Sequence, residues 1–168
     1  MRGFVRVVDN ISTAFGKVSL YLLLVMWVLM TVGVVARYGF GMPLKWVPES
    51  TLFLFGVSFM LAGAITLQCG EHVRVEILVN RISSPKMRRV LDLVTSLAFW
   101  LFGFMLLYWG VIGASTSVRA LETSGTYWDP PVWPVKVIIP LSACLILLQG
   151  VAKSVRDWHF VRTGKELD

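Results

Sequence analysis

The sequence predicts an all-α integral membrane protein with four transmembrane helices. Hydrophobic residues make up 56% of the chain, whereas soluble domains contain roughly 45–50%. Residues 18–36, 50–69 and 93–118 contain no charged residue and no histidine, and each stretch has about the 17–25 residues that a helix needs to cross a bilayer. A shorter uncharged run, 137–152, is flanked by Lys136 and Lys153, whose side chains can snorkel and extend it.

The basic residues predict the orientation of these helices. Twelve of the sixteen lysines and arginines lie before the first span, between the second and third, or after the fourth. The other two connections hold the remaining four, which are Arg37, Lys45, Arg119 and Lys136. Because the cytoplasmic side of a membrane protein carries the excess of positive charge, we expect both termini in the cytoplasm. The net charge of +6 is thus explained by orientation, and we expect no nucleic-acid partner.

We expect one membrane domain, 1–168, in which two amphipathic helices lie in the inner interface. The first covers 1–17, where Phe4, Val8, Ile11 and Phe15 share one helical stripe; a simple cytoplasmic extension of the first span is the alternative. The expected order from there is a span at 18–37, a span at 48–69, an interfacial helix at 73–83, a span at 90–118, an outer loop at 119–133, a span at 134–153 and a cytoplasmic tail at 154–168.

The outer connection between the first two spans carries the first candidate functional residues, Arg37, Trp46 and Glu49. Trp46 suits the membrane interface, Pro48 suits the first turn of a helix, and Glu49 suits the positive end of the helix dipole. These roles explain Glu49 structurally. The alternative is that Glu49 lies in an interface with another protein, with Arg37 as a possible ion-pair partner, because an unpaired charge near membrane depth is costly.

The inner connection between the second and third spans is strongly basic. Pro85 is expected as the first residue of the third membrane helix, after the N-cap candidate Ser84. We expect the basic side chains around it to bind anionic lipid headgroups. These lipid-anchoring candidates are Arg74, Arg81, Lys86, Arg88 and Arg89.

The second outer connection is rich in aromatic and acidic residues and in proline. Anchoring in the outer interface is one explanation, and a docking surface for a soluble partner is the other. The docking candidates are Glu122, Tyr127, Trp128, Asp129 and Trp133. Next to this loop, Gly110, Gly113, Ala114 and Ser117 form a small-residue pattern that permits close helix approach. Pro140 is expected to kink the fourth helix or remove one backbone hydrogen bond.

Residues for catalysis or cofactor binding are not evident. No span carries an acidic residue in its middle, and His72 and His159 fall outside the spans, so axial haem ligation within the bundle is not expected. Cys69 and Cys144 have no metal-site or redox spacing. We therefore expect a non-catalytic membrane scaffold with no metal and no cofactor.

Several short motifs, in their order along the chain, resemble a known family. They are Arg37-Tyr38, Trp46 with Glu49, His72-Val73-Arg74-Val75, Pro85 before the basic cluster, and Pro131-Val132-Trp133-Pro134. Together they resemble the small, DctQ-like membrane subunit of tripartite ATP-independent periplasmic (TRAP) transporters. One departure is Pro48, where many members carry an acidic residue beside the glutamate.

The resemblance implies a subunit of a sodium-coupled importer of an organic anion, usually a carboxylate, in the bacterial inner membrane. The large (DctM-like) membrane subunit would hold the substrate and sodium sites. The small subunit would pack on its scaffold and help a periplasmic (DctP-like) binding protein to dock. Two alternatives are an autonomous transporter or channel that self-associates through the small residues of the third span, and a membrane anchor of a redox complex.

Overall fold

The computed structural model describes residues 2–69 and 85–163, with side chains for 3–69 and 96–156. The described residues form four helices: α1 (Arg2–Gly39), α2 (Val47–Gln68), α4 (Pro85–Arg119) and α5 (Trp133–Thr163). Each contains a stretch that is long and apolar enough to cross a membrane. The predicted all-α class with four spanning helices is therefore confirmed, with α4 beginning at Pro85 as expected and α5 continuing past its span.

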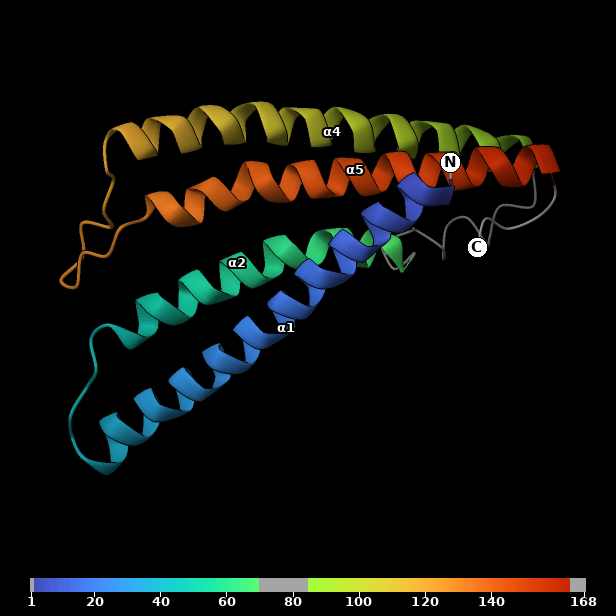
Figure 1. Ribbon diagram of the computed structural model, residues 1–168. Helices are drawn as coiled ribbons and strands as arrows, with labels where there is room; N and C mark the ends of the chain where they lie inside the picture. Colours follow the sequence, from blue (N-terminus) through green and yellow to red (C-terminus); the bar gives the residue numbers. More distant parts are fainter. Residues whose placement is uncertain (1, 70–84, 164–168) are drawn as a thin grey trace.

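The helices are arranged as two hairpins, α1 with α2 and α4 with α5 (Figure 1). The hairpins meet through α2 and α5, which lie at the centre of the bundle. The N-terminal end of α1 crosses α5 at the end of the bundle where α1 begins and α5 ends, which we call the inner end after its predicted orientation (Figure 1). The C-terminal end of α1 diverges from the other hairpin (Figure 1). The inner end is thus the end at which the first and last helices meet.

Residues 2–39 form one continuous helix, without a break between the predicted interfacial segment and the first span. This agrees with the alternative of a helical extension, and the depth of residues 1–17 relative to the lipid stays a prediction. Of the four residues in the predicted amphipathic stripe, Phe4 and Ile11 are exposed, Val8 is buried and Phe15 is half-buried. A series of buried or half-buried positions of α1 repeats with alternating steps of three and four residues: 5, 8, 12, 15, 19, 22, 26, 29, 33 and 36. Gly16, beside this series, is buried as well.

This repeat has the heptad spacing of a left-handed helix pair, in which small side chains allow close packing. Ser19 is buried and its hydroxyl donates to the Ser58 carbonyl of α2 at 2.7 Å. The predicted amphipathic stripe shares Val8 and Phe15 with this packing face, whereas Phe4 and Ile11 lie outside it.

The core lies where α2 and α5 pack together. Leu61 and Ala64 of α2 are buried against Leu145 of α5. On the other side of α5, Gly110 of α4 faces the backbone of Pro140: a Cβ at Gly110 would lie 3.3 Å from the Pro140 nitrogen. The small-residue pattern of the third span therefore packs within the chain. Ala114 and Ser117 are also buried, while Gly113 has open space around its Cα.

Large hydrophobic side chains cover the outward faces of α1 and α4, where Trp27, Phe102 and Trp109 are each at least 60% exposed. Such an exposed apolar surface is expected where helices face lipid tails or another membrane protein. The predicted interfacial helix 73–83, with Arg74 and Arg81, lies outside the described residues. Lys86, Arg88 and Arg89 lie on the first turns of α4, and their side chains are outside the described part.

Candidate functional site

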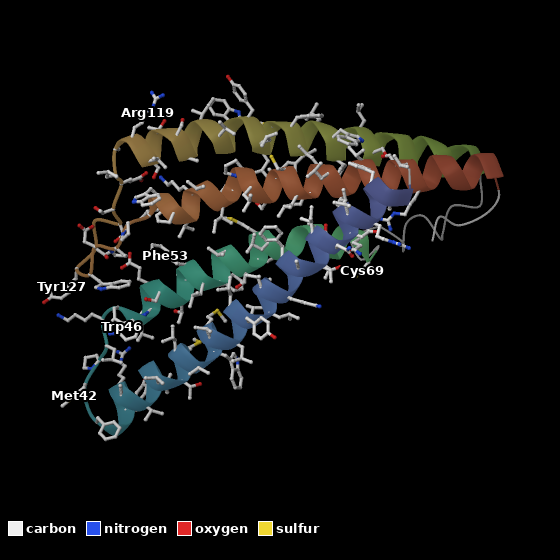
Figure 2. The ribbon with its side chains drawn as sticks, viewed as in Figure 1. Met42, Trp46, Phe53, Cys69, Arg119 and Tyr127 are labelled. Atoms are coloured by element: carbon white, nitrogen blue, oxygen red, sulfur yellow. The ribbon has the colours of Figure 1, made fainter. Side chains whose placement is uncertain are left out.

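The outer connections of the two hairpins contact each other and form what we call the outer cluster. It consists of Lys45, Trp46 and Glu49 from the start of α2 and Thr126, Tyr127 and Trp128 from the loop between α4 and α5. Figure 2 shows Trp46 and Tyr127 at this same end of the bundle. Each pair in the cluster joins one hairpin to the other.

The loop that carries half of the outer cluster is folded. Thr123 and Pro131 form an isolated antiparallel bridge, and the Val132 amide donates to the Glu122 carbonyl at 2.9 Å. The chain reverses at Gly125, whose positive φ of 67° suits glycine. The Asp129 carboxylate accepts a hydrogen bond from the Gly125 amide at 2.8 Å and so closes the loop.

Three contacts hold this loop on the start of α2. The Thr126 hydroxyl donates to Glu49 Oε2 at 2.7 Å. The Lys45 ammonium lies 3.8 Å from the centroid of the Tyr127 ring, within the range of a cation–π interaction. The rings of Trp46 and Trp128 pack with their centroids 6.3 Å apart. An acidic, a cationic and an aromatic contact thus connect the same two segments.

Glu49 occupies the first turn of α2, as expected for a carboxylate at a helix N-terminus. Its hydrogen-bond partner is Thr126, and the ion pairs formed within residues 3–69 and 96–156 are Lys136–Glu122 and Arg156–Asp9. Arg37 therefore does not pair with Glu49. Its guanidinium lies 5.8 Å from the centroid of the Tyr38 ring instead.

Trp46 and Glu49, predicted as subunit-interface residues, and Tyr127 and Trp128, predicted as docking residues, thus belong to one cluster. Arg37 lies outside it. Neither role is tested by the geometry, so both stay predictions. Tyr127 is 84% exposed and Trp128 is 46% exposed, so aromatic surface remains available at the outer face.

Glu122 and Asp129 have partners within the loop and its flanking helix. The Lys136 ammonium of α5 lies 2.7 and 2.6 Å from the two Glu122 carboxylate oxygens. The hydrogen bond from Lys136 lowers the pKa of the Glu122 carboxyl below its ordinary value of 4.5. Trp133, the remaining docking candidate, is the first residue of α5 and is half-buried. These residues shape the loop that the cluster presents.

A second polar group, which we call the inner cluster, connects α1 to α5 at the other end. It consists of Asp9, Ser12, Gln149 and Arg156. The Gln149 side chain is fully buried; its amide nitrogen donates to Asp9 Oδ1 at 2.9 Å, and its amide oxygen accepts from the Ser12 hydroxyl at 3.1 Å. The Arg156 guanidinium donates to the same Asp9 oxygen at 3.1 Å.

Sequence reasoning missed the inner cluster, because the fourth uncharged run was evaluated for charges only. Gln149 was a usable signal, since an amide within a spanning helix is costly unless it is hydrogen-bonded. Its partner Asp9 lies at the same end of the bundle. The two residues are 140 positions apart, so no sequence spacing predicts that they meet.

Within the described ranges, His, Cys, Asp and Glu residues form no group of three or more that could hold a metal ion. Cys69 and Cys144 are both exposed and free. The polar groups that the structure brings together are therefore hydrogen-bonding and ionic groups that connect helices.

Comparison with known proteins identifies a family and a similar protein. The model of the family described as "Tripartite ATP-independent periplasmic transporters, DctQ component" matches residues 26–160, a range that includes parts of all four helices. The chain is also similar to the C4-dicarboxylate TRAP transporter small permease protein DctQ of Rhodobacter capsulatus, with 28% identity over 127 residues. That alignment covers 74% of this chain and 53% of the relative, so the chain spans about half the length of the relative it matches.

Proposed function

The chain belongs to the DctQ component family of the tripartite ATP-independent periplasmic transporters, and from this premise we propose that it is the small, non-catalytic membrane subunit of a sodium-coupled importer of organic anions. The relative's name specifies a C4-dicarboxylate, which supports a carboxylate as the substrate class. In this proposal the chain is a multi-pass protein of the bacterial inner membrane. The substrate and sodium sites belong to the large membrane subunit.

The observation that carries this proposal, beside the family match, is how the chain uses its buried polar groups. The Ser12 hydroxyl donates a hydrogen bond to the Gln149 side chain, and the Ser19 hydroxyl donates one to the backbone carbonyl of Ser58. These groups connect the chain's own helices, which is the property expected of a rigid support. A support of this kind suits a subunit that holds the scaffold of the large membrane subunit in place while the transport domain moves.

We propose that this subunit contacts its partners through two surfaces, which are the exposed apolar faces of its helices and the outer cluster. The large subunit would cover part of the exposed hydrophobic surface of the helices. The periplasmic binding protein would contact the outer cluster, where Tyr127 is exposed; Phe40 and Met42, in the connection between α1 and α2, are exposed as well. Exposed aromatic residues are enriched among the residues that dominate binding energy at interfaces.

Co-expression with the large subunit and the binding protein from the same transport system tests the assembly. We expect a tag on this chain to recover the large subunit in detergent, and sodium-driven uptake in proteoliposomes to need both membrane subunits. We expect Glu49→Gln to weaken recovery of the large subunit, because the variant removes the carboxylate charge from the first turn of α2. Thr51→Ala is the matched control, since this exposed hydroxyl bonds only the Pro48 carbonyl of its own helix.

Recovery of this chain without the large subunit would overturn the assembly proposal. Full assembly and full uptake by Glu49→Gln would remove the interface role that we give Glu49. Solute flux through the purified chain alone would instead support an autonomous transporter.

A further inference from the structure

The outer ends of α4 and α5 border a shallow, widely open groove that none of the roles above uses. It has a volume of about 380 Å³ and is lined by Val111, Ala114, Ser115, Val118 and Arg119 of α4 and by Val137 and Pro140 of α5. Five of these seven residues are apolar, and the groove is open along one side. From Val111 to Arg119 it follows α4 for about 12 Å at 1.5 Å per residue.

Arg119 differs from the other basic residues at the outer end of the bundle. Lys136 pairs with Glu122, Lys45 lies on the Tyr127 ring, and Arg37 lies beside the Tyr38 ring. Arg119 forms no ion pair and no ring contact with the described residues. Figure 2 shows it at the last turn of α4, with its side chain directed away from the bundle.

A guanidinium at this level of a membrane favours an anion, because charge-assisted hydrogen bonds from arginine suit phosphate oxygens. The groove adjoining it is apolar and continues toward the middle of the span. Arg119, on the last turn of α4, is the charged residue of an otherwise mostly apolar lining. This combination of charge and apolar surface suits a phospholipid with its phosphate at the headgroup level.

We propose that this groove is a phospholipid-binding site, in which one acyl chain lies along Val111, Val118 and Val137 and the phosphate binds Arg119. The site requires only that α4 and α5 span the membrane, so it does not depend on which substrate or partner the transporter has. A bound lipid would fill the space between the two helices beside Pro140. It would also connect the loop that follows Arg119 to the outer leaflet.

Native mass spectrometry of the full chain, released from detergent after incubation with phosphatidylglycerol, tests the site. We expect one retained lipid, and weaker retention of a diacylglycerol with the same chains, because it lacks the phosphate. A soluble glycerophosphate is expected not to be retained, because it lacks the acyl chain. Arg119→Gln is expected to lower the affinity for phosphatidylglycerol about fivefold, the size of one basic contact to an anionic headgroup.

Two further variants separate the groove from the general lipid surface. Ser115→Trp adds a large side chain at an exposed groove position and is expected to reduce retention of the lipid to background. Arg37→Gln changes another exposed outer arginine and should leave retention unchanged. Thermal unfolding of each variant must match the original chain, so that a loss of lipid is not a loss of fold.

The proposal would be overturned if Arg119→Gln and Ser115→Trp retained as much lipid as the original chain. It would also be overturned if Arg119→Gln and Arg37→Gln lost the same amount of bound lipid. A lipid that binds the isolated chain but is absent from the complex with the large subunit would also overturn it, since a protein surface would then cover the groove.

Discussion

The two polar clusters differ in burial and in what surrounds them. The outer cluster contains exposed side chains and joins two connecting segments through a hydroxyl, an ammonium and two indole rings. The inner cluster centres on Gln149, which is fully buried and joins two helices directly. Water can replace a lost contact at the outer cluster, whereas a lost partner at the inner cluster leaves a buried polar group unpaired. We therefore expect stability to depend on the inner cluster and recognition to depend on the outer one.

The largest expected effect is the loss of stability in Gln149→Ala. The substitution removes the partner of the Ser12 hydroxyl and one of two side-chain donors to Asp9. We expect the free energy of unfolding in detergent micelles to fall by about 1–3 kcal/mol. This range is the cost of leaving a buried polar group without a hydrogen-bond partner. A typical hydrogen bond between membrane helices contributes about as much as the lower end of this range, or less.

Gln68→Ala is the matched control for this loss. Gln68 is half-buried, and its side-chain contact is a 3.5 Å approach from the Thr13 hydroxyl. The Gln68→Ala variant should lose much less stability than the Gln149→Ala variant. Equal losses in the two variants would show that the inner cluster has no special role in the bundle.

The second expected effect concerns binding by the outer cluster. Tyr127→Ala removes the most exposed aromatic ring of the cluster, and we expect it to weaken binding of the periplasmic protein about fivefold or more, as for an interface residue worth at least about 1 kcal/mol. Its stability should change by no more than about 1 kcal/mol, because the ring's contact with Lys45 is exposed. Surface plasmon resonance with the reconstituted complex measures the affinity.

Tyr38→Ala is the control for the docking surface, since Tyr38 is 79% exposed at the end of α1 and outside the cluster. An unchanged affinity in Tyr127→Ala would assign the outer loop to membrane anchoring alone. A large loss of stability in the same variant would remove the contrast between the clusters.

The smallest expected effect is a pH dependence at Glu122. Its pKa is lowered by Lys136, so the folded state binds a proton less readily than the unfolded state. The stabilisation is therefore present above the ordinary pKa of 4.5 and is lost as the pH falls through the lowered pKa. We expect the stability difference between the original chain and Glu122→Gln to be constant near neutral pH and to shrink in acid.

Thermal unfolding of both proteins over a series of acidic pH values measures this difference. Lys136→Met should lose about as much stability at neutral pH as Glu122→Gln does. The stability of Lys136→Met should then show no acid dependence from the pairing of Glu122 with Lys136. A stability difference that grows as the pH falls would contradict the assigned direction of the pKa shift.

The four spans could be predicted from sequence because crossing a bilayer requires long uncharged stretches. The starts of α2 and α4 were also predictable, since Pro48 and Pro85 lie in their first turns. The packing face of α1 was not, because small residues such as Ser12, Ser19 and Gly33 interrupt its large apolar side chains. A hydrophobic pattern predicts which residues avoid water. In a membrane, lipid and protein are both apolar, so the same pattern does not separate the lipid face from the protein face.

The candidate site was predictable in four of its six residues and not in its connections, and sequence reasoning missed Lys45 and Thr126. Trp46, Glu49, Tyr127 and Trp128 were identified by type and position. Their grouping depends on how the two hairpins approach each other, and no short-range signal encodes that approach. The hydrogen bond between Thr126 and Glu49 joins residues 77 positions apart.

The bond between Asp9 and Gln149 has a consequence for biosynthesis. The two residues are 140 positions apart, and a ribosome adds about 5–20 residues per second, so Asp9 is made roughly 7–28 s before its partner. During this interval the first helix must be held at the inner surface with its carboxylate hydrated or bound elsewhere. The chain can acquire its final inner contacts only after its last helix has been made, which makes insertion of α5 the step that completes the bundle.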